Sequence, residues 1–273
     1  MNPGDAKEDG LIDADSLSEV LESFADAGLA RRRGKHLKPL KGLRGTPLSE
    51  VARVSAVVWK EGGVSLFDDA DELHNLFCTA QEDGLLAIGL VAAAAPDDPD
   101  EALDLAERWL EMVDDLETAD ALGWSLYGPA LLASDRSFEH ALLSQLGSAA
   151  ARRRVAVMAL MAALPVPMEG PSVAALRERV GERHIVITGE PLSAAVSAVC
   201  HGYRADSDPH VRKALGRVLR TWGECDPEAA AAWLVEAQDR GGMPKFMRES
   251  ALKGVKKGRR RLQTLGDSDG GAS

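Results

Sequence analysis

The chain has 273 residues and a formal net charge of −11, and this acidic balance argues against a general attraction to polyanions. Aromatic residues make up only 4% of it, whereas alanine and leucine are abundant, which favours closely packed helices over a sheet-rich core. The apolar run nearest to a membrane span is 85–95, and a span needs about 20 residues, so we expect no membrane partner.

Both ends of the chain are poor in apolar residues, and we expect residues 1–14 and 263–273 to be disordered. The N-terminal stretch is polar and acidic, without the apolar region of a secretion signal. We therefore expect a cytoplasmic protein, nucleoid-associated if bacterial. The three cysteines form no CxxC pair, which indicates reduced, buried thiols. Neither cysteines nor histidines have metal-ligand spacing, and we expect no metal and no other cofactor.

Helical patterns follow one another through the middle of the chain, separated by short breaks rich in Pro, Gly and Asp. The predicted helices are 15–29, 47–60, 69–78, 80–95, 100–113, 117–133, 137–147, 149–163, 171–181, 190–203, 208–223, 226–238 and 244–256. The one strand-like run, RHIVIT (183–188), makes no sheet alone. Short turns predict antiparallel helix pairs that stack into one all-α domain over 15–262, an α-solenoid. The pattern alone leaves a globular bundle as the alternative.

Positive charge is concentrated in three segments. Residues 31–44 contain seven Lys or Arg and no acid, ARRR (151–154) opens a helix, and KGVKKGRRR (253–261) follows the last predicted break. Acidic residues gather elsewhere. In a solenoid this segregation predicts a concave, partly basic face that suits phosphate binding. A solvated surface is the alternative for each cluster.

The helix predicted over 208–223 is amphipathic. Lys213, Arg217 and Arg220 fall within about 60° of one another on a helical projection. The opposite side carries an apolar set that we expect in the core, namely Val211, Leu215, Val218, Leu219 and Trp222.

HVRKALGRVLRTWGECDPEAAAAWL (210–234), with LR after its RKALG core and DP before the next helix, resembles the AlkD-type DNA alkylation repair family. RRRVAVMAL (152–160), LETADALGWSLYGPALL (116–132) and ARRRGKHLKPLKGLRG (30–45) are similar to further segments of that family. The matches occur in the family's order and cover about residues 18–258. The resemblance implies HEAT-like helical repeats, and an alkylpurine DNA glycosylase that acts as a monomer on alkylated or distorted double-stranded DNA.

The resemblance places the catalytic carboxylate at Asp120, the last residue of LETAD. An N3- or N7-alkylated purine is cationic, so it leaves without a general acid or a metal. The deoxyribose then becomes oxocarbenium-like, and a fixed carboxylate stabilises that cation and orients the attacking water.

The chain departs from the family pattern at two tryptophan positions, where it has Leu116 and Arg217. Those aromatic rings would pack against the lesion-bearing nucleotide, so Leu116 keeps the position of a lesion contact and Trp124, one turn beyond Asp120, is the candidate replacement. Arg217 suits a DNA phosphate better than an alkylpurine. The complete set of predicted backbone contacts is Arg153, Arg154, Lys35, Lys38, Lys41, Lys213, Arg217 and Arg220.

Three functions remain open from the sequence. The first is a monofunctional DNA glycosylase. The second is a non-catalytic HEAT-like module that binds damaged or distorted DNA. The two missing tryptophans favour this second function over the first. The third is a protein-interaction solenoid, in which the acidic surfaces matter.

Overall fold

The computed structural model describes residues 13–37, 41–62, 69–164, 189 and 191–269. Within these ranges all regular structure is helical and no strand occurs, which confirms the all-α prediction. The predicted helix 171–181, the strand-like run 183–188 and Lys38 lie outside the described residues.

The contacts divide the chain into two compact units, Met1–Ala130 and Leu131–Ser273. The boundary falls inside the single domain predicted over 15–262, within helix α8 (Gly128–Ala133). The first helix begins at Ala14, and the last helix ends at Asp269.

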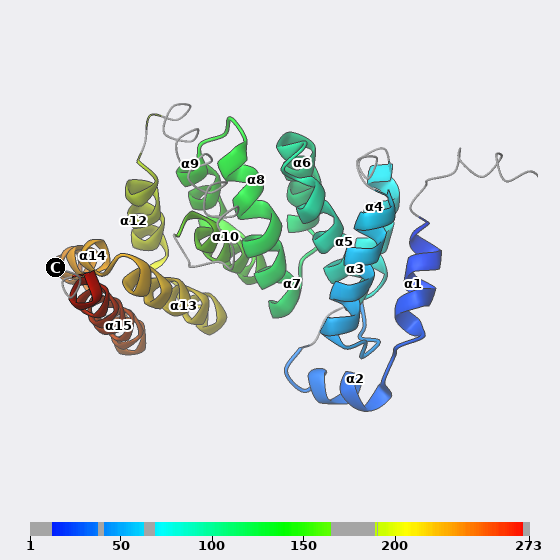
Figure 1. Ribbon diagram of the computed structural model, residues 1–273, viewed down its shortest axis with the longest axis horizontal. Coiled ribbons are helices and arrows are strands. Elements are labelled where there is room, and N and C mark those ends of the chain that lie inside the picture. The colour runs from blue at the N-terminus through cyan, green and yellow to red at the C-terminus, as the bar shows by residue number, and fades with distance from the viewer. Residues whose placement is uncertain (1–12, 38–40, 63–68, 165–188, 190, 270–273) are drawn as a thin grey trace, which may run out of the picture. The chain divides into compact units, whose positions relative to one another are not determined.

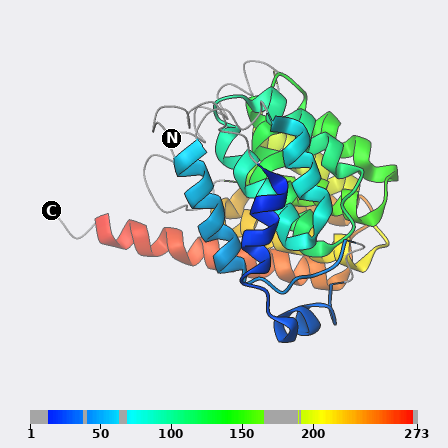
Figure 2. The same cartoon turned by 90° about the vertical axis from the view of Figure 1, so that its right-hand side faces the viewer.

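The first unit contains two rows of helices. The first row is α1 (Ala14–Glu22), α4 (Ala70–Thr79) and α6 (Pro99–Leu110), and the second is α3 (Leu48–Gly62), α5 (Gln81–Ala94) and α7 (Leu116–Ala121). Each helix contacts its neighbours within its row, and α5 also packs against α4 (Figure 1). Such a two-layer stack is the local arrangement of an α-solenoid. The short helix α2 (Ala27–Arg33) lies at one end of α1 and α3 (Figures 1 and 2).

The helix predicted over 15–29 is in fact two helices. Asp26 caps the second of them, since its carboxylate accepts a hydrogen bond from the Leu29 amide at 2.7 Å. An Asp at this position satisfies an amide that would otherwise lack a partner, so it favours a helix start over helix continuation.

The helix predicted over 117–133 contains a π-helical segment, Leu122–Tyr127, between α7 and α8. The Gly128 amide donates to the Gly123 carbonyl five residues back, as a π-helix requires. Pro129 gives a local reason for the change, because proline has no amide hydrogen and its ring clashes with the α-helical carbonyl four residues earlier. The wide turn begins two residues after Asp120.

The second unit repeats the two-row arrangement. One row is α9 (Phe138–Leu143), α12 (Leu192–Tyr203) and α14 (Pro227–Asp239); the other is α10 (Ala150–Ala163), α13 (Pro209–Cys225) and α15 (Lys245–Asp269). A short 3₁₀ turn, Ser144–Gly147, follows α9. Figure 2 shows α15 as one long continuous helix.

Helices α13 and α15 are parallel and pack backbone to backbone. Gly216 faces Ser250, and Gly223 faces Val255 further along both helices. The Ser250 hydroxyl donates to the Gly216 carbonyl at 2.8 Å. A Cβ atom on Gly223 would lie 2.6 Å from the Val255 nitrogen, and one on Gly254 would overlap the Arg220 carbonyl group. Glycine is therefore required at this contact by close approach.

Replacing Gly254 by Ala is expected to lower the free energy of unfolding by about 1–3 kcal/mol, because the added methyl group must push two helix backbones apart. Urea denaturation measures the change. Gly147→Ala is the matched control, since a Cβ there meets nothing within 4 Å and its stability should not fall. Equal stability of the two variants would show that the backbones of α13 and α15 can move apart without lowering the free energy of unfolding.

Candidate functional site

A cleft of about 500 Å³ lies in the first unit between α3, α5 and α7. Its lining is mostly aliphatic, with two carboxylates from one helix, Glu117 and Asp120. Asp120 is half-buried. A carboxylate in apolar surroundings interacts more strongly with a cation than one in water does. The cleft thus has the chemistry to hold a positively charged group.

An aromatic side chain faces the same cleft. Trp59, near the end of α3, is half-buried and lines the cleft together with Asp120. The two residues are 61 positions apart, so the sequence carried no signal that brings them together. An indole face attracts cations and stacks on bases, and it therefore adds to the same chemistry as the carboxylate.

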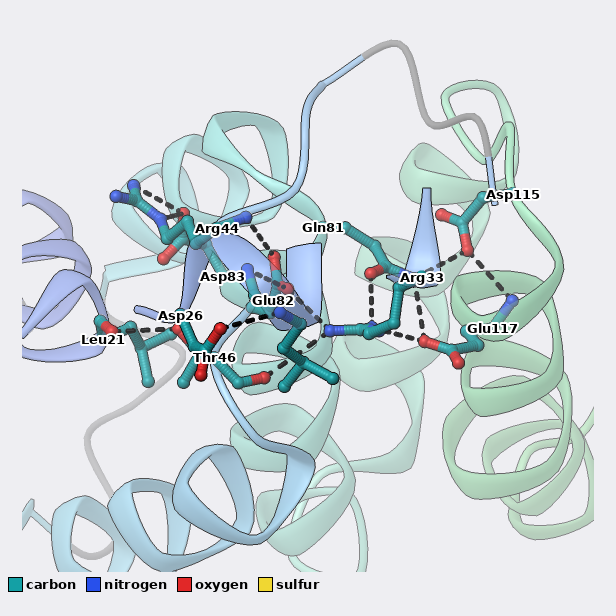
Figure 3. A network of polar contacts seen from close by, with 12 residues as sticks. Leu21, Asp26, Arg33, Arg44, Thr46, Gln81, Glu82, Asp83, Asp115 and Glu117 are labelled. Carbon is teal, nitrogen blue, oxygen red and sulfur yellow. Dashed lines mark hydrogen bonds and ion pairs between the residues drawn. The ribbon is translucent and has the colours of Figure 1, made fainter. Parts of the chain in front are cut away.

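Glu117 has its own partners and serves to position α7. It forms an ion pair with Arg33 of α2, and it accepts a hydrogen bond from the Gln81 side-chain amide at 3.1 Å. Gln81 also donates to Asp115 at 2.9 Å, and Asp115 caps the amides of Glu117 and Thr118. Figure 3 shows Arg33 between Gln81, Glu82 and Glu117. These contacts fix the N-terminus of the helix that carries Asp120.

Two arginines of the basic segment 31–44 bind buried carboxylates. Arg33 lies 2.6 Å from Glu82, and Arg44 lies 2.9 Å from Asp83. Neither carboxylate side chain is exposed to solvent. Burial raises the pKa of Asp83, and Arg44 opposes that rise. Two arginines of this segment therefore hold α5 in place through ion pairs. The number of charges in the segment did not predict this structural role.

Lys41, a predicted DNA contact, is also held inside the unit. Its ammonium group donates to the Phe77 carbonyl at 2.7 Å and lies 3.5 Å from the centre of the Phe77 ring. Burial lowers its pKa. Lys35, by contrast, is exposed on the surface next to α2. Of these two lysines, Lys35 is the exposed one.

The two arginines predicted from α10 make internal contacts in the second unit. Arg153 pairs with Asp206 through two nitrogen atoms, at 2.7 and 3.3 Å. Arg154 is only 5% exposed and donates to the His210 carbonyl at 2.6 Å. The latter bond holds the first turn of α13. Both side chains thus have structural partners, and Arg154 leaves little surface for a DNA phosphate.

The polar face of α13 agrees with its sequence pattern. Lys213, Arg217 and Arg220 are exposed. The predicted apolar set is buried, and Trp222, 4% exposed, packs against Trp233. Arg220 forms an ion pair with Glu224 one turn later, at 3.1 Å.

Comparison with known protein families identifies the family of this chain. Residues 17–255 match the family model described as DNA alkylation repair enzyme. The chain belongs to this family. A comparison with curated proteins gave no match. Membership confirms the resemblance drawn from the motifs, and it places this DNA alkylation repair protein in DNA repair.

The two candidate lesion contacts of this DNA alkylation repair protein lie outside the cleft lining. Leu116 is the half-buried first residue of α7, and Trp124 is 40% exposed within the π-helical segment. The lining includes neither of them. The π-helical segment begins at Leu122, between Asp120 and Trp124. Trp59 is the aromatic residue that shares the cleft with Asp120.

The described residues of this family member contain no group of three or more His, Cys, Asp or Glu side chains arranged to hold a metal ion. No helix in the described part of the chain is both long and apolar enough to span a bilayer. Cys200 is fully buried, whereas Cys78 and Cys225 are half-buried, and none of the three forms a disulfide.

Proposed function

We propose that this protein is a DNA glycosylase that hydrolyses the N-glycosidic bond of cationic N3- or N7-alkylated purines in duplex DNA. The observation that carries the proposal is the cleft that Asp120 and Trp59 both line, together with aliphatic side chains. Membership of the DNA alkylation repair enzyme family supports DNA as the substrate.

The chemistry needs one carboxylate and one water molecule. The bond between C1′ and the purine nitrogen breaks with its electron pair going to the base, which neutralises the alkylpurine cation. The deoxyribose is left with oxocarbenium character, and the Asp120 carboxylate stabilises that charge. Water then adds to C1′, and its proton passes to the carboxylate or to solvent. Trp59 offers an aromatic face to the cationic base or sugar.

A non-catalytic DNA-binding module is the second candidate, and one observation favours it. Arg217, exposed on α13, replaces a tryptophan of the family pattern and brings a guanidinium that binds phosphate rather than an alkylated base. Such a protein would bind distorted DNA without releasing a base.

Base release from methylated duplex DNA separates the two candidates. The protein is incubated with DNA that contains 7-methylguanine and 3-methyladenine, and the free bases are quantified by chromatography. Release above the spontaneous rate supports the glycosylase. Binding with a steep salt dependence but no release supports the binding module, and the glycosylase proposal then fails.

A further inference from the structure

A thiol, an imidazole and a thioether meet at one place in the first unit. They belong to Cys78 and His74 of α4 and to Met112, which follows the end of α6. The Cys78 sulfur lies 3.7 Å from the His74 Nε2 atom and 3.7 Å from the Met112 sulfur. The lining of the Asp120 cleft includes none of the three. The function proposed above therefore leaves this cluster without a role.

The packing of α4 against α6 holds Cys78 and Met112 side by side. Phe77, next to Cys78 in the chain, stacks on Trp109 of α6 with the ring centres 4.6 Å apart. Met112 stays close to the end of α6, because its amide donates to the Trp109 carbonyl at 3.0 Å. Side chains placed by the packing of rigid helices form a preorganised ligand set.

The distances within the cluster suit a metal ion. Metal–sulfur and metal–nitrogen bonds measure about 2.3 and 2.1 Å in zinc sites. At bond angles of about 110–120°, two such ligands of one ion lie roughly 3.6–4.0 Å apart. Both distances from the Cys78 sulfur, to His74 and to Met112, fall in this range. A thiol has one hydrogen to donate, so a hydrogen bond from Cys78 accounts for only one of the two contacts.

The ligand types favour a soft monovalent ion over zinc. Thiolate and thioether sulfur select Cu(I), and imidazole also binds copper, whereas zinc sites use Cys, His and carboxylate ligands. The charges nearby favour the same ion. Lys41 interacts electrostatically with Cys78 and His74, and Arg108 acts on His74, where Asp71 opposes both cations. Cu(I) on a thiolate adds no net charge beside these cations, whereas a divalent ion adds one positive charge.

We propose that His74, Cys78 and Met112 bind one Cu(I) ion. The Cys78 thiol loses its proton to solvent and its sulfur forms a bond to the ion, while the His74 Nε2 atom and the Met112 sulfur supply the other two bonds. The copper stays Cu(I), so no electron is transferred. Met112 is 37% exposed, which gives the ion access from solvent.

The sequence did not indicate this site, because its third ligand is distant in the chain. His74 and Cys78 are four residues apart on α4, but Met112 follows Cys78 by 34 residues. One ligand is also a methionine, so the set differs from the groups of His, Cys, Asp and Glu that the described residues lack.

Competition for Cu(I) tests the site. The reduced full-length protein is titrated without oxygen against the Cu(I) indicator bicinchoninate, and the loss of the coloured indicator complex gives affinity and stoichiometry. Cys78→Ser should weaken Cu(I) binding by more than about 100-fold, because changes beyond the ligands themselves already cost about 10–100-fold. Met112→Leu keeps the side-chain volume and should weaken binding by at least about 10-fold.

Cys225→Ser and Met243→Leu are the matched controls, since each removes the same type of sulfur group from a half-buried position in the second unit. One tightly bound Cu(I) in wild type and both controls, with weaker binding in Cys78→Ser and Met112→Leu, supports the site. Wild-type affinity in Met112→Leu overturns it, because Cys78 then binds copper as an isolated thiol. Equal losses in Cys78→Ser and Cys225→Ser show unspecific binding to thiols and also overturn it. Displacement of Cu(I) by equimolar Zn(II) overturns the choice of a soft monovalent ion.

Discussion

Asp120→Asn is expected to lower the rate of alkylpurine release by about 10²- to 10³-fold, the typical effect of removing one electrostatic contact to a transition state. The substitution keeps the shape of the side chain and removes its negative charge. The amide dipole cannot balance an oxocarbenium ion as a carboxylate does, so single-turnover release from methylated duplex DNA should slow. DNA affinity should change by much less, because the charge matters chiefly in the transition state.

Asp71→Asn provides the matched control. Asp71 is a carboxylate of the same unit with an 88% exposed side chain, and it lies outside the cleft lining. Its variant should release base at the wild-type rate. If Asp120→Asn also releases base at that rate, Asp120 is not the catalytic carboxylate, whatever the chain does with DNA.

Arg33→Ala is expected to lower the free energy of unfolding by about 3–5 kcal/mol, the usual cost of removing one partner of a buried ion pair. The reason is Glu82, whose side chain has no exposure and would keep a buried charge without its guanidinium. Gln81 and Glu117 would lose the same partner. Urea denaturation of both proteins measures the difference.

Two further variants sharpen this test. Arg32→Ala removes a neighbouring exposed arginine and should change stability by no more than about 0.5 kcal/mol. Adding Glu82→Gln to Arg33→Ala removes the unpaired charge and should recover part of the lost stability. If Arg33→Ala is as stable as Arg32→Ala, the network around Arg33 does not hold α2, α5 and α7 together.

The sequence predicted well what depends on local pattern. The polar and apolar faces of α13 follow from 3.6-residue periodicity, and its core set and Trp222 are buried as expected. Ordered motifs also indicated the family, with similarity over about 18–258 against the matched range 17–255. In both cases the information lies in residues close together in the chain.

What the sequence could not predict depends on partners far apart. Charge counting treated 31–44 as a DNA-binding segment, yet Arg33 and Arg44 bind Glu82 and Asp83, which lie 49 and 39 residues away. Trp59 was not predicted as a site residue for the same reason, since no residue near it in the sequence indicates that it lines a cleft together with Asp120. Charge alone does not distinguish a guanidinium group that binds a buried carboxylate from one that is exposed and can bind a phosphate.

The glycine contact between α13 and α15 has a consequence for binding energetics. Cations on a flexible loop must be ordered when they meet a ligand, and that loss of conformational entropy weakens binding. Here Gly223 and Gly254 fix the separation and register of two backbones before any ligand arrives. The ordering of these backbones occurs during folding, so the exposed side chains of α13, including Lys213, Arg217 and Arg220, project from fixed backbone positions.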